Sequence, residues 1–200
     1  PRREEKNVPP VTSTPRLTLV LGGARSGKSR YAESLIESQP GAWVYLATAT
    51  PGDDEMRARI QTHRARRGAR WHTVEEPLEL AAALGRAAAA DTAILVDCLT
   101  LWLANVIAAG RDADAEFAAL IRALTGAPGT LAGPIVLVSS EVGFGIVPDN
   151  AAARRFRDLA GVLHQAVAGV AQSVVLVCAG LPLHFKSPPE MHEAGVGERR

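Results

Sequence analysis

Aromatic residues are scarce in this chain, and long apolar runs are absent from it. Phe, Trp and Tyr make up 4% of the 200 residues, so the core is expected to consist mainly of aliphatic side chains and alanine. No uninterrupted apolar stretch approaches the roughly 18 residues that a membrane-spanning helix needs, so we expect no membrane span. The amino end also lacks the apolar segment of a signal peptide.

Cysteine is rare as well, and the net charge is close to zero. Cys98 and Cys178 each lie in an apolar run, without a CxxC spacing or a histidine cluster, which disfavours zinc and redox sites. Both are predicted to be buried and reduced, which suits a cytoplasmic location. The formal net charge of +1 gives no reason to expect nucleic acid as a partner.

The two ends of the chain differ in composition from its middle. Residues 1–15 are charged and proline-rich, and residues 187–200 are similar, so we predict a disordered leader and a disordered tail without chemistry. The length suits a single domain, which is expected to cover residues 16–186.

Short aliphatic runs alternate with helical patterns inside this domain. Buried strands are predicted at residues 17–21, 43–47, 93–97, 135–139 and 174–178, with a short edge strand at 71–74. Helices are expected to begin at Lys28, near Asp53, near Pro77, near Leu99 and after Pro148. This alternation predicts an α/β fold in which helices flank a mostly parallel sheet.

Residues 22–29 match the phosphate-binding pattern GxxxxGK[ST] at every position, between a predicted strand and a predicted helix. We expect their backbone N–H groups to bind phosphate, Lys28 to reach the β- and γ-phosphates, and the Ser29 hydroxyl to bind Mg²⁺. The predicted fold is therefore a P-loop NTPase of the RecA-like type. The motif consists of Gly22, Gly23, Ala24, Arg25, Ser26, Gly27, Lys28 and Ser29.

A P-loop site also needs a carboxylate on the metal side. Asp97 closes an aliphatic run, which predicts a position at the carboxyl end of a strand, where α/β proteins bind ligands. The alternative role for Asp97 is to cap the helix that follows. Glu141, after the run at 135–140, is the competing carboxylate.

One histidine lies in an arginine-rich segment, residues 53–70. At 100° per residue, Met56, Ile60, His63 and Arg67 share one face of the predicted helix, so His63 is directed toward the protein body. The surrounding arginines favour a neutral imidazole, which is the form a nucleophile requires. A structural or surface role for His63, and RNA binding by the arginines, remain alternatives.

Taken together, the motifs resemble the bifunctional adenosylcobinamide kinase/adenosylcobinamide-phosphate guanylyltransferase family of cobalamin biosynthesis. The most specific shared blocks are DDEMRARIQTHRARR at 53–67 and SSEVGFGIVPDN at 139–150. The P-loop and ILVDCLTLWLAN at 94–105 also match, and the resemblance covers about residues 16–186. Relatives often have Asn in place of Ser140 and of His164, so contacts to the corrinoid are the part of the resemblance that these differences affect.

The resemblance implies two reactions. A nucleoside triphosphate, ATP or GTP, phosphorylates adenosylcobinamide, and GMP from GTP is then transferred through a guanylyl-histidine to give adenosylcobinamide-GDP. The family's guanylylated histidine corresponds to His63, and Lys28 is the second implied catalytic residue. Mg²⁺ would be bound by Ser29 and Asp97, and the protein would be a homotrimer. The implied nucleotide contacts beyond the P-loop are Thr48, Ala49, Thr50, Arg64, Ala65, Arg66, Arg67, Glu75 and Asp97.

Two other functions are compatible with the motifs. One is a P-loop kinase for another small alcohol, with His63 uninvolved, and the other is a nucleotide-sensing module that binds a partner through its arginines. The apolar glycine-containing loop at 142–148 serves either packing or contact with the corrinoid.

Overall fold

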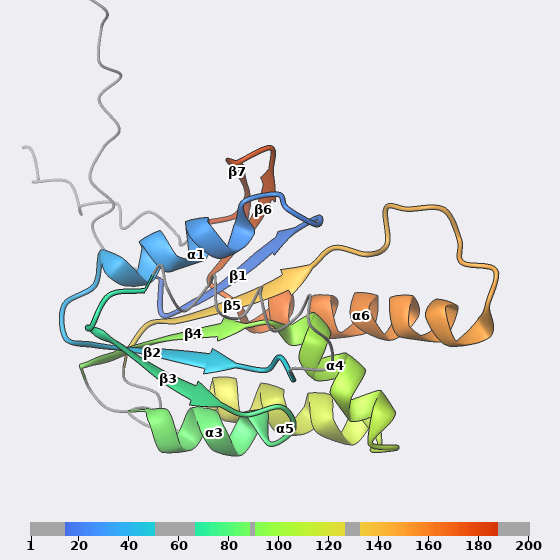
Figure 1. Cartoon of the computed structure of the whole chain (residues 1–200), viewed down its shortest axis with the longest axis horizontal. Coiled ribbons are helices and arrows are strands. Elements are labelled where there is room, and N and C mark those ends of the chain that lie inside the picture. The colour runs from blue at the N-terminus through green and yellow to red at the C-terminus, as the bar shows by residue number, and fades with distance from the viewer. Residues whose placement is uncertain (1–14, 51–66, 89–90, 127–132, 188–200) are drawn as a thin grey trace, which may run out of the picture.

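The computed structural model describes residues 15–50, 67–88, 91–126 and 133–187. A seven-stranded sheet lies at the centre, with strand order β3-β2-β4-β5-β1-β6-β7 (Figure 1). The strands are β1 (Leu17–Gly22), β2 (Ala42–Ala47), β3 (Trp71–Glu75), β4 (Thr92–Asp97), β5 (Ile135–Ser140), β6 (Ser173–Cys178) and β7 (Leu181–Lys186). The helices are α1 (Lys28–Glu37), α3 (Leu80–Ala87), α4 (Leu99–Ala108), α5 (Ala113–Thr125) and α6 (Ala151–Val170).

Six of the strands are parallel, and only β7 is antiparallel to its neighbour β6. The order places β5 between β1, which leads into the P-loop, and β4, which ends at Asp97. The predicted mostly parallel α/β fold is therefore confirmed. Because the six parallel strands point the same way, their carboxyl ends share one edge of the sheet, where ligands bind in such folds.

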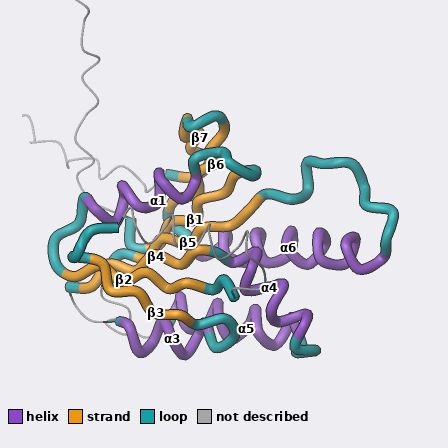
Figure 2. Tube along the Cα trace, in the orientation of Figure 1, coloured by secondary structure: helices purple, strands orange, loops and turns teal. Residues whose placement is uncertain are grey.

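Helices cover both faces of the sheet (Figure 2). On one face, α1 packs on the central strands through a core that includes Ile36, Val20 and Leu95. On the other face, α3 to α6 form a larger core that includes Trp102 and Phe117. The central strands are buried on both sides, which explains why their sequences are continuous aliphatic runs rather than alternating patterns.

Several local expectations differ from the structure. Helix α3 begins at Leu80 rather than near Pro77, since the Glu76 carboxylate accepts the N–H groups of Leu78 and Glu79. Helix α5 and strand β7 were not expected from the sequence. The helix predicted from Asp53 lies outside the described residues. Within the described part of the chain, no helix combines the length and apolarity needed to cross a bilayer.

The expectation for the cysteines was half wrong. Cys98 is buried, and burial raises the pKa of its thiol to about 11, so it stays protonated at neutral pH. Cys178 is exposed, because β6 ends there and the chain turns outward into β7. An apolar run before a cysteine at the end of a strand therefore does not show whether that cysteine is buried or exposed.

Candidate functional site

The P-loop joins β1 to α1, as its sequence context predicts. Gly27 has a φ of 95°, a conformation that favours glycine. A Cβ at Gly22 would lie 2.5 Å from the Ser26 Oγ and 2.6 Å from the Val177 carbonyl oxygen, so a larger residue does not fit there. The Gly180 N–H donates to the Ser26 carbonyl over 2.8 Å, which ties the loop to the β6–β7 turn.

Helix α1 presents its amino end to the loop. Its N-cap residue, Gly27, has no side chain to occupy the first-turn N–H groups, which favours an anionic ligand at this end. The Lys28 ammonium donates to the Gly23 carbonyl over 3.1 Å and therefore lies over the loop. The backbone and Lys28 together form a cradle suited to phosphate oxygens.

Asp97 closes β4 at the same edge of the sheet. The hydroxyl of Tyr45 on β2 donates to the Asp97 Oδ2 over 3.1 Å. Burial, and next the negative charge of Asp97, raise the pKa of Tyr45 well above its usual value, so the tyrosine remains a donor. The alternative role, a helix cap, is not found, since the N-cap residue of α4 is Cys98.

Arg67 lies against this pair. Its guanidinium carbon is 3.4 Å from the centroid of the Tyr45 ring, a close cation–π geometry. Arg70 lies 4.0 Å from the Trp43 ring centroid and donates to the Gly41 carbonyl over 3.0 Å. The end of the arginine-rich segment is thus fixed to the α1 face of the sheet. His63, Arg64, Ala65 and Arg66 lie outside the described residues.

The three predicted nucleotide contacts after β2 differ from one another in burial. Thr48 is fully buried, and its hydroxyl accepts from the Cys98 N–H over 2.8 Å and donates to the Cys98 carbonyl over 2.7 Å. It therefore holds the turn that follows Asp97. Ala49 is half-buried, while Thr50 is exposed and donates to Asn105 on α4 over 3.4 Å. Glu75 is exposed at the carboxyl end of β3.

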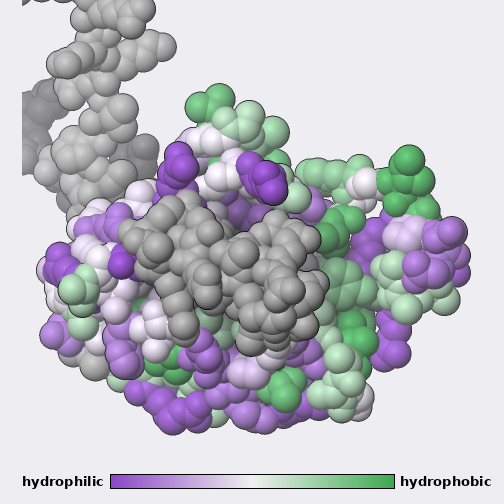
Figure 3. All heavy atoms as spheres, in the orientation of Figure 1, coloured by the Kyte–Doolittle hydropathy of each residue, from purple (hydrophilic) through white to green (hydrophobic). Residues whose placement is uncertain are grey.

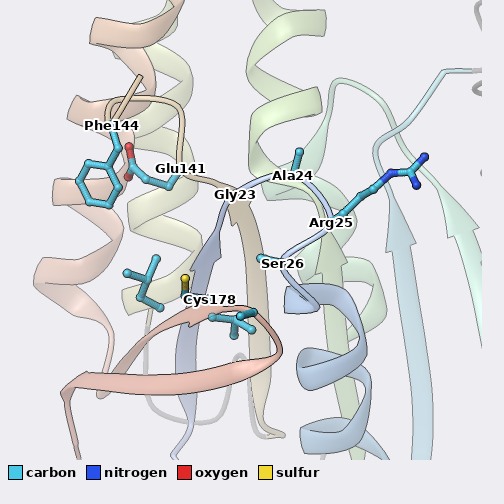
Figure 4. A pocket seen from close by; sticks show the side chains of 10 residues that line it. Gly23, Ala24, Arg25, Ser26, Glu141, Phe144 and Cys178 are labelled. Carbon is cyan, nitrogen blue, oxygen red and sulfur yellow. The ribbon is translucent and has the colours of Figure 1, made fainter. Parts of the chain in front are cut away.

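A pocket of about 460 Å³ adjoins the P-loop on the side of β5 and β6 (Figure 4). Glu141 and Phe144 lie side by side at its rim, and Arg25 points away from it. The Glu141 N–H donates to the Gly22 carbonyl over 3.0 Å, which fixes Glu141 beside the first glycine of the loop. The lining is Gly23, Ala24, Arg25, Ser26, Glu141, Phe144, Leu176, Val177, Cys178 and Ala179.

Behind this pocket lies a buried histidine, His164, which the sequence connected only with contacts to the corrinoid. His164 on α6 is 8% exposed, and its Nε2 lies 2.7 Å from the Ser139 Oγ. Its Nδ1 is 3.7 Å from the Glu141 Oε2. The sequence of α6 does not indicate these partners, because they come from β5 and the residue that follows it.

Exposed apolar side chains form two groups, one on β7 and one on the loop between β5 and α6 (Figure 3). Phe144 and Ile146, from the loop between β5 and α6, are 84% and 97% exposed. Strand β7 is exposed along its whole length. Apolar surface of this extent usually marks a binding or assembly surface. Its members are Phe144, Ile146, Val147, Leu181, Leu183 and Phe185.

The metal-binding prediction is compatible with the chemistry of the donors. Ser29 and Asp97 offer hydroxyl and carboxylate oxygens, the type of ligand that Mg²⁺ takes alongside phosphates and water. Among the described residues, no group of three or more His, Cys, Asp or Glu is arranged to hold a metal by itself. A shared site with a nucleotide fits these residues, and an all-protein cage does not.

Known proteins similar to this chain come from cobalamin biosynthesis. A bifunctional adenosylcobalamin biosynthesis protein CobP from Pseudomonas aeruginosa is 50% identical over 173 residues, covering 86% of this chain and 98% of that protein. A bifunctional adenosylcobalamin biosynthesis protein CobU from Salmonella typhimurium is 43% identical over 181 residues, covering 85% and 99%. One from Escherichia coli is 38% identical over 185 residues, covering 85% and 99%.

Solved structures with similar folds support the fold class. A type III secretion system ATPase has a TM-score of 0.52 at 12% identity, covering 80% of this chain and 50% of that one. A Pyrococcus horikoshii protein, PH0250, has a TM-score of 0.52 at 10% identity, covering 88% of both chains. The model of the family described as cobinamide kinase / cobinamide phosphate guanyltransferase matches residues 18–185. This chain belongs to that family.

Proposed function

We propose that this chain phosphorylates the free hydroxyl of adenosylcobinamide with a nucleoside triphosphate and then transfers GMP from GTP to the product, giving adenosylcobinamide-GDP. The observation that carries the proposal is the complete P-loop at the sheet edge where Asp97, Tyr45 and Arg67 meet. Family membership supplies the substrate class.

The triphosphate is proposed to bind along the P-loop. Its backbone N–H groups and the amino end of α1 surround the phosphates, and Lys28 moves from the Gly23 carbonyl to a phosphate oxygen. Ser29 and Asp97 would hold Mg²⁺, which neutralises charge on the phosphates when it is bound. Tyr45 orients the Asp97 carboxylate through its hydroxyl.

The guanylyl step is proposed to use His63 as the nucleophile on the α-phosphorus of GTP. Arg67 follows His63 by four residues and lies beside the Tyr45–Asp97 pair, which supports a location of the segment near the phosphates. Arg64, Ala65 and Arg66 would complete the contacts of this segment. Glu75 would accept hydrogen bonds from the guanine edge, and Thr48, Ala49 and Thr50 would shape the wall after β2.

Incubation with α-labelled GTP tests this proposal. The wild-type protein is expected to acquire a covalent GMP that is labile in acid and stable in alkali, because the bond joins phosphorus to an imidazole nitrogen. The His63→Ala variant is expected to lose the adduct completely. Mass spectrometry of the labelled peptide measures both results.

His72→Ala is the matched control, since His72 is an exposed histidine on β3. It should label like the wild type. A label that persists in His63→Ala, or that maps to another residue, would contradict the transferase mechanism. A wild-type protein that transfers γ-phosphate but never acquires GMP would instead favour the simpler kinase.

The corrinoid is proposed to contact the apolar loop at 142–148, where Phe144 and Ile146 are exposed. One domain, residues 16–186, would carry both reactions, with 1–15 and 187–200 outside it, and the match to the family model over 18–185 supports these bounds. The two free cysteines suit the cytoplasm.

A homotrimer is proposed as the functional assembly. Strand β7 ends the sheet and exposes Leu181, Leu183 and Phe185, apolar surface that a second copy of the chain would cover. Sedimentation equilibrium is expected to give three times the 21.1 kDa of one chain. Leu183→Glu should lower this mass, because it places a charge in the apolar interface. A monomeric wild-type protein would refute the assembly.

A further inference from the structure

The carboxylate of Glu141 lines the pocket and lies beside a buried histidine, and no role in nucleotide binding accounts for this arrangement. Glu141 follows the last residue of β5, and its backbone N–H donates a hydrogen bond to the Gly22 carbonyl. Glu141 therefore lies directly beside the phosphate cradle. Its side chain is 17% exposed and lines the pocket together with the P-loop residues Gly23 and Ser26. A carboxylate in this position would lie between a nucleotide on the phosphate loop and a second substrate in the pocket.

A chain of hydrogen-bonding groups leads from the interior to this carboxylate. The Ser140 N–H donates to the Thr100 Oγ1 over 2.6 Å, and the Thr100 and Ser139 hydroxyls are 3.1 Å apart. Ser139 reaches His164 Nε2, and His164 Nδ1 faces Glu141. One donor direction that satisfies every group runs from Thr100 to Ser139, from Ser139 to His164 Nε2, and places the Nδ1–H toward the carboxylate.

This direction requires a neutral imidazole with its proton on Nδ1. Burial lowers the pKa of His164, which favours the neutral form, while the charge of Glu141 acts in the opposite sense. The second carboxylate oxygen, Oε1, accepts the N–H of Gly143. Glu141 is therefore held by a hydrogen bond from its own loop, while His164 on α6 lies 3.7 Å from its other oxygen.

The remaining walls of the pocket are apolar. Phe144, Leu176 and Val177 line it, so a bound alcohol would place its carbon atoms against them and its hydroxyl toward Glu141. A volume of about 460 Å³ lies in the lower part of the range for small-molecule sites. It suits the hydroxyl-bearing side arm of a corrinoid, while the macrocycle itself would remain outside, beside the exposed Ile146.

We propose that Glu141 is the general base of the phosphoryl-transfer step and that His164 is its positioning residue. This inference rests on the proposed kinase function. The carboxylate takes the proton of the acceptor hydroxyl as that oxygen forms a bond to the γ-phosphorus. The bond between the γ-phosphorus and the β,γ-bridging oxygen breaks, and its electron pair leaves with the nucleoside diphosphate.

The decisive variant is Glu141→Gln, which keeps an oxygen to accept the Gly143 N–H but cannot take a proton. The rate of γ-phosphate transfer to adenosylcobinamide is expected to fall about 10²–10⁴-fold. Nucleotide affinity and the formation of covalent GMP at His63 should stay within about twofold, because neither uses the acceptor hydroxyl. Asp149→Asn, an exposed carboxylate in the same loop, is the control and should match the wild type in every assay.

Two variants of His164 test its positioning role. His164→Asn keeps an N–H donor toward Glu141 and is expected to retain most of the transfer rate. His164→Leu removes that donor and should lower the rate about tenfold, without changing nucleotide affinity. Equal losses in both variants would indicate packing alone and would overturn the role assigned to His164.

Three results would overturn the assignment of Glu141. The first is a transfer rate in Glu141→Gln within about threefold of the wild type. The second is a parallel loss of nucleotide affinity and GMP adduct, which would make Glu141 part of the nucleotide site. The third is a wild-type protein that forms the GMP adduct but transfers no γ-phosphate, in which case the kinase half of the proposed function fails as well.

Discussion

Replacing Lys28 with methionine is expected to lower kcat/KM for γ-phosphate transfer about a thousandfold, the scale of one well-placed charged group in phosphoryl transfer. Methionine keeps an unbranched side chain of similar length in α1 but has no ammonium group. The charge that develops on the β- and γ-phosphates then loses its stabilising partner. Single-turnover transfer from γ-labelled nucleotide measures the loss.

The structure explains why the fold should survive this change. Lys28 is half-buried, and its ammonium donates to the Gly23 carbonyl of the loop, a contact near water that contributes little to stability. Arg30→Met is the matched control, because Arg30 is exposed on the same helix. It should behave like the wild type. A Lys28→Met protein that still transfers phosphate within tenfold of the wild-type rate would remove Lys28 from the chemistry.

The P-loop and the sheet could be predicted because their signals are local. The phosphate motif is contiguous, and the strands β1, β4 and β5 are buried on both faces, so each appears as an unbroken aliphatic run. The position of Asp97 at the carboxyl end of β4 could be predicted in the same way, because Asp97 closes such a run. Its partner Tyr45 could not be predicted, because the register of β2 against β4 is a property of the folded sheet.

Other features depend on contacts between distant segments and therefore leave no local pattern. His164 and Ser139 are separated by 25 positions, and nothing in the sequence around either residue indicates that the two side chains meet. Helix α5 begins at a capping Asp112, but it follows α4 so closely that the alanine-rich stretch gave no clear boundary. Strand β7 contains Pro182 and exposes every residue, which is tolerated at a sheet edge but is not typical of strands.

The surroundings of Thr48 in the site also could not be predicted from the local sequence. The resemblance to the family implied a nucleotide contact, whereas in this structure the Thr48 hydroxyl is buried and makes both of its hydrogen bonds to the Cys98 backbone. The nucleotide contact stays a prediction, and it would have to use the backbone of the turn. The side chain has a second role, since it fixes the residue that follows Asp97.

The Thr48→Val variant is therefore expected to lower the free energy of unfolding by about 1–3 kcal/mol, the cost of leaving a buried N–H without a partner. That N–H belongs to Cys98, whose carbonyl still accepts the Trp102 N–H over 3.1 Å. Valine has nearly the same shape, so no cavity contributes to the loss. Urea denaturation followed by circular dichroism measures the difference. Phosphoryl transfer should fall as well, because the turn after Asp97 loses its anchor.

Thr50→Val is the control for this experiment. Thr50 is exposed, and its hydrogen bond to Asn105 is 3.4 Å long, so the change in stability should stay within about 0.5 kcal/mol. If Thr48→Val proves as stable as Thr50→Val, the two bonds to Cys98 do not hold the turn. A loss of stability in Thr48→Val with full phosphoryl transfer would instead show that the anchor matters for folding but not for the placement of Asp97.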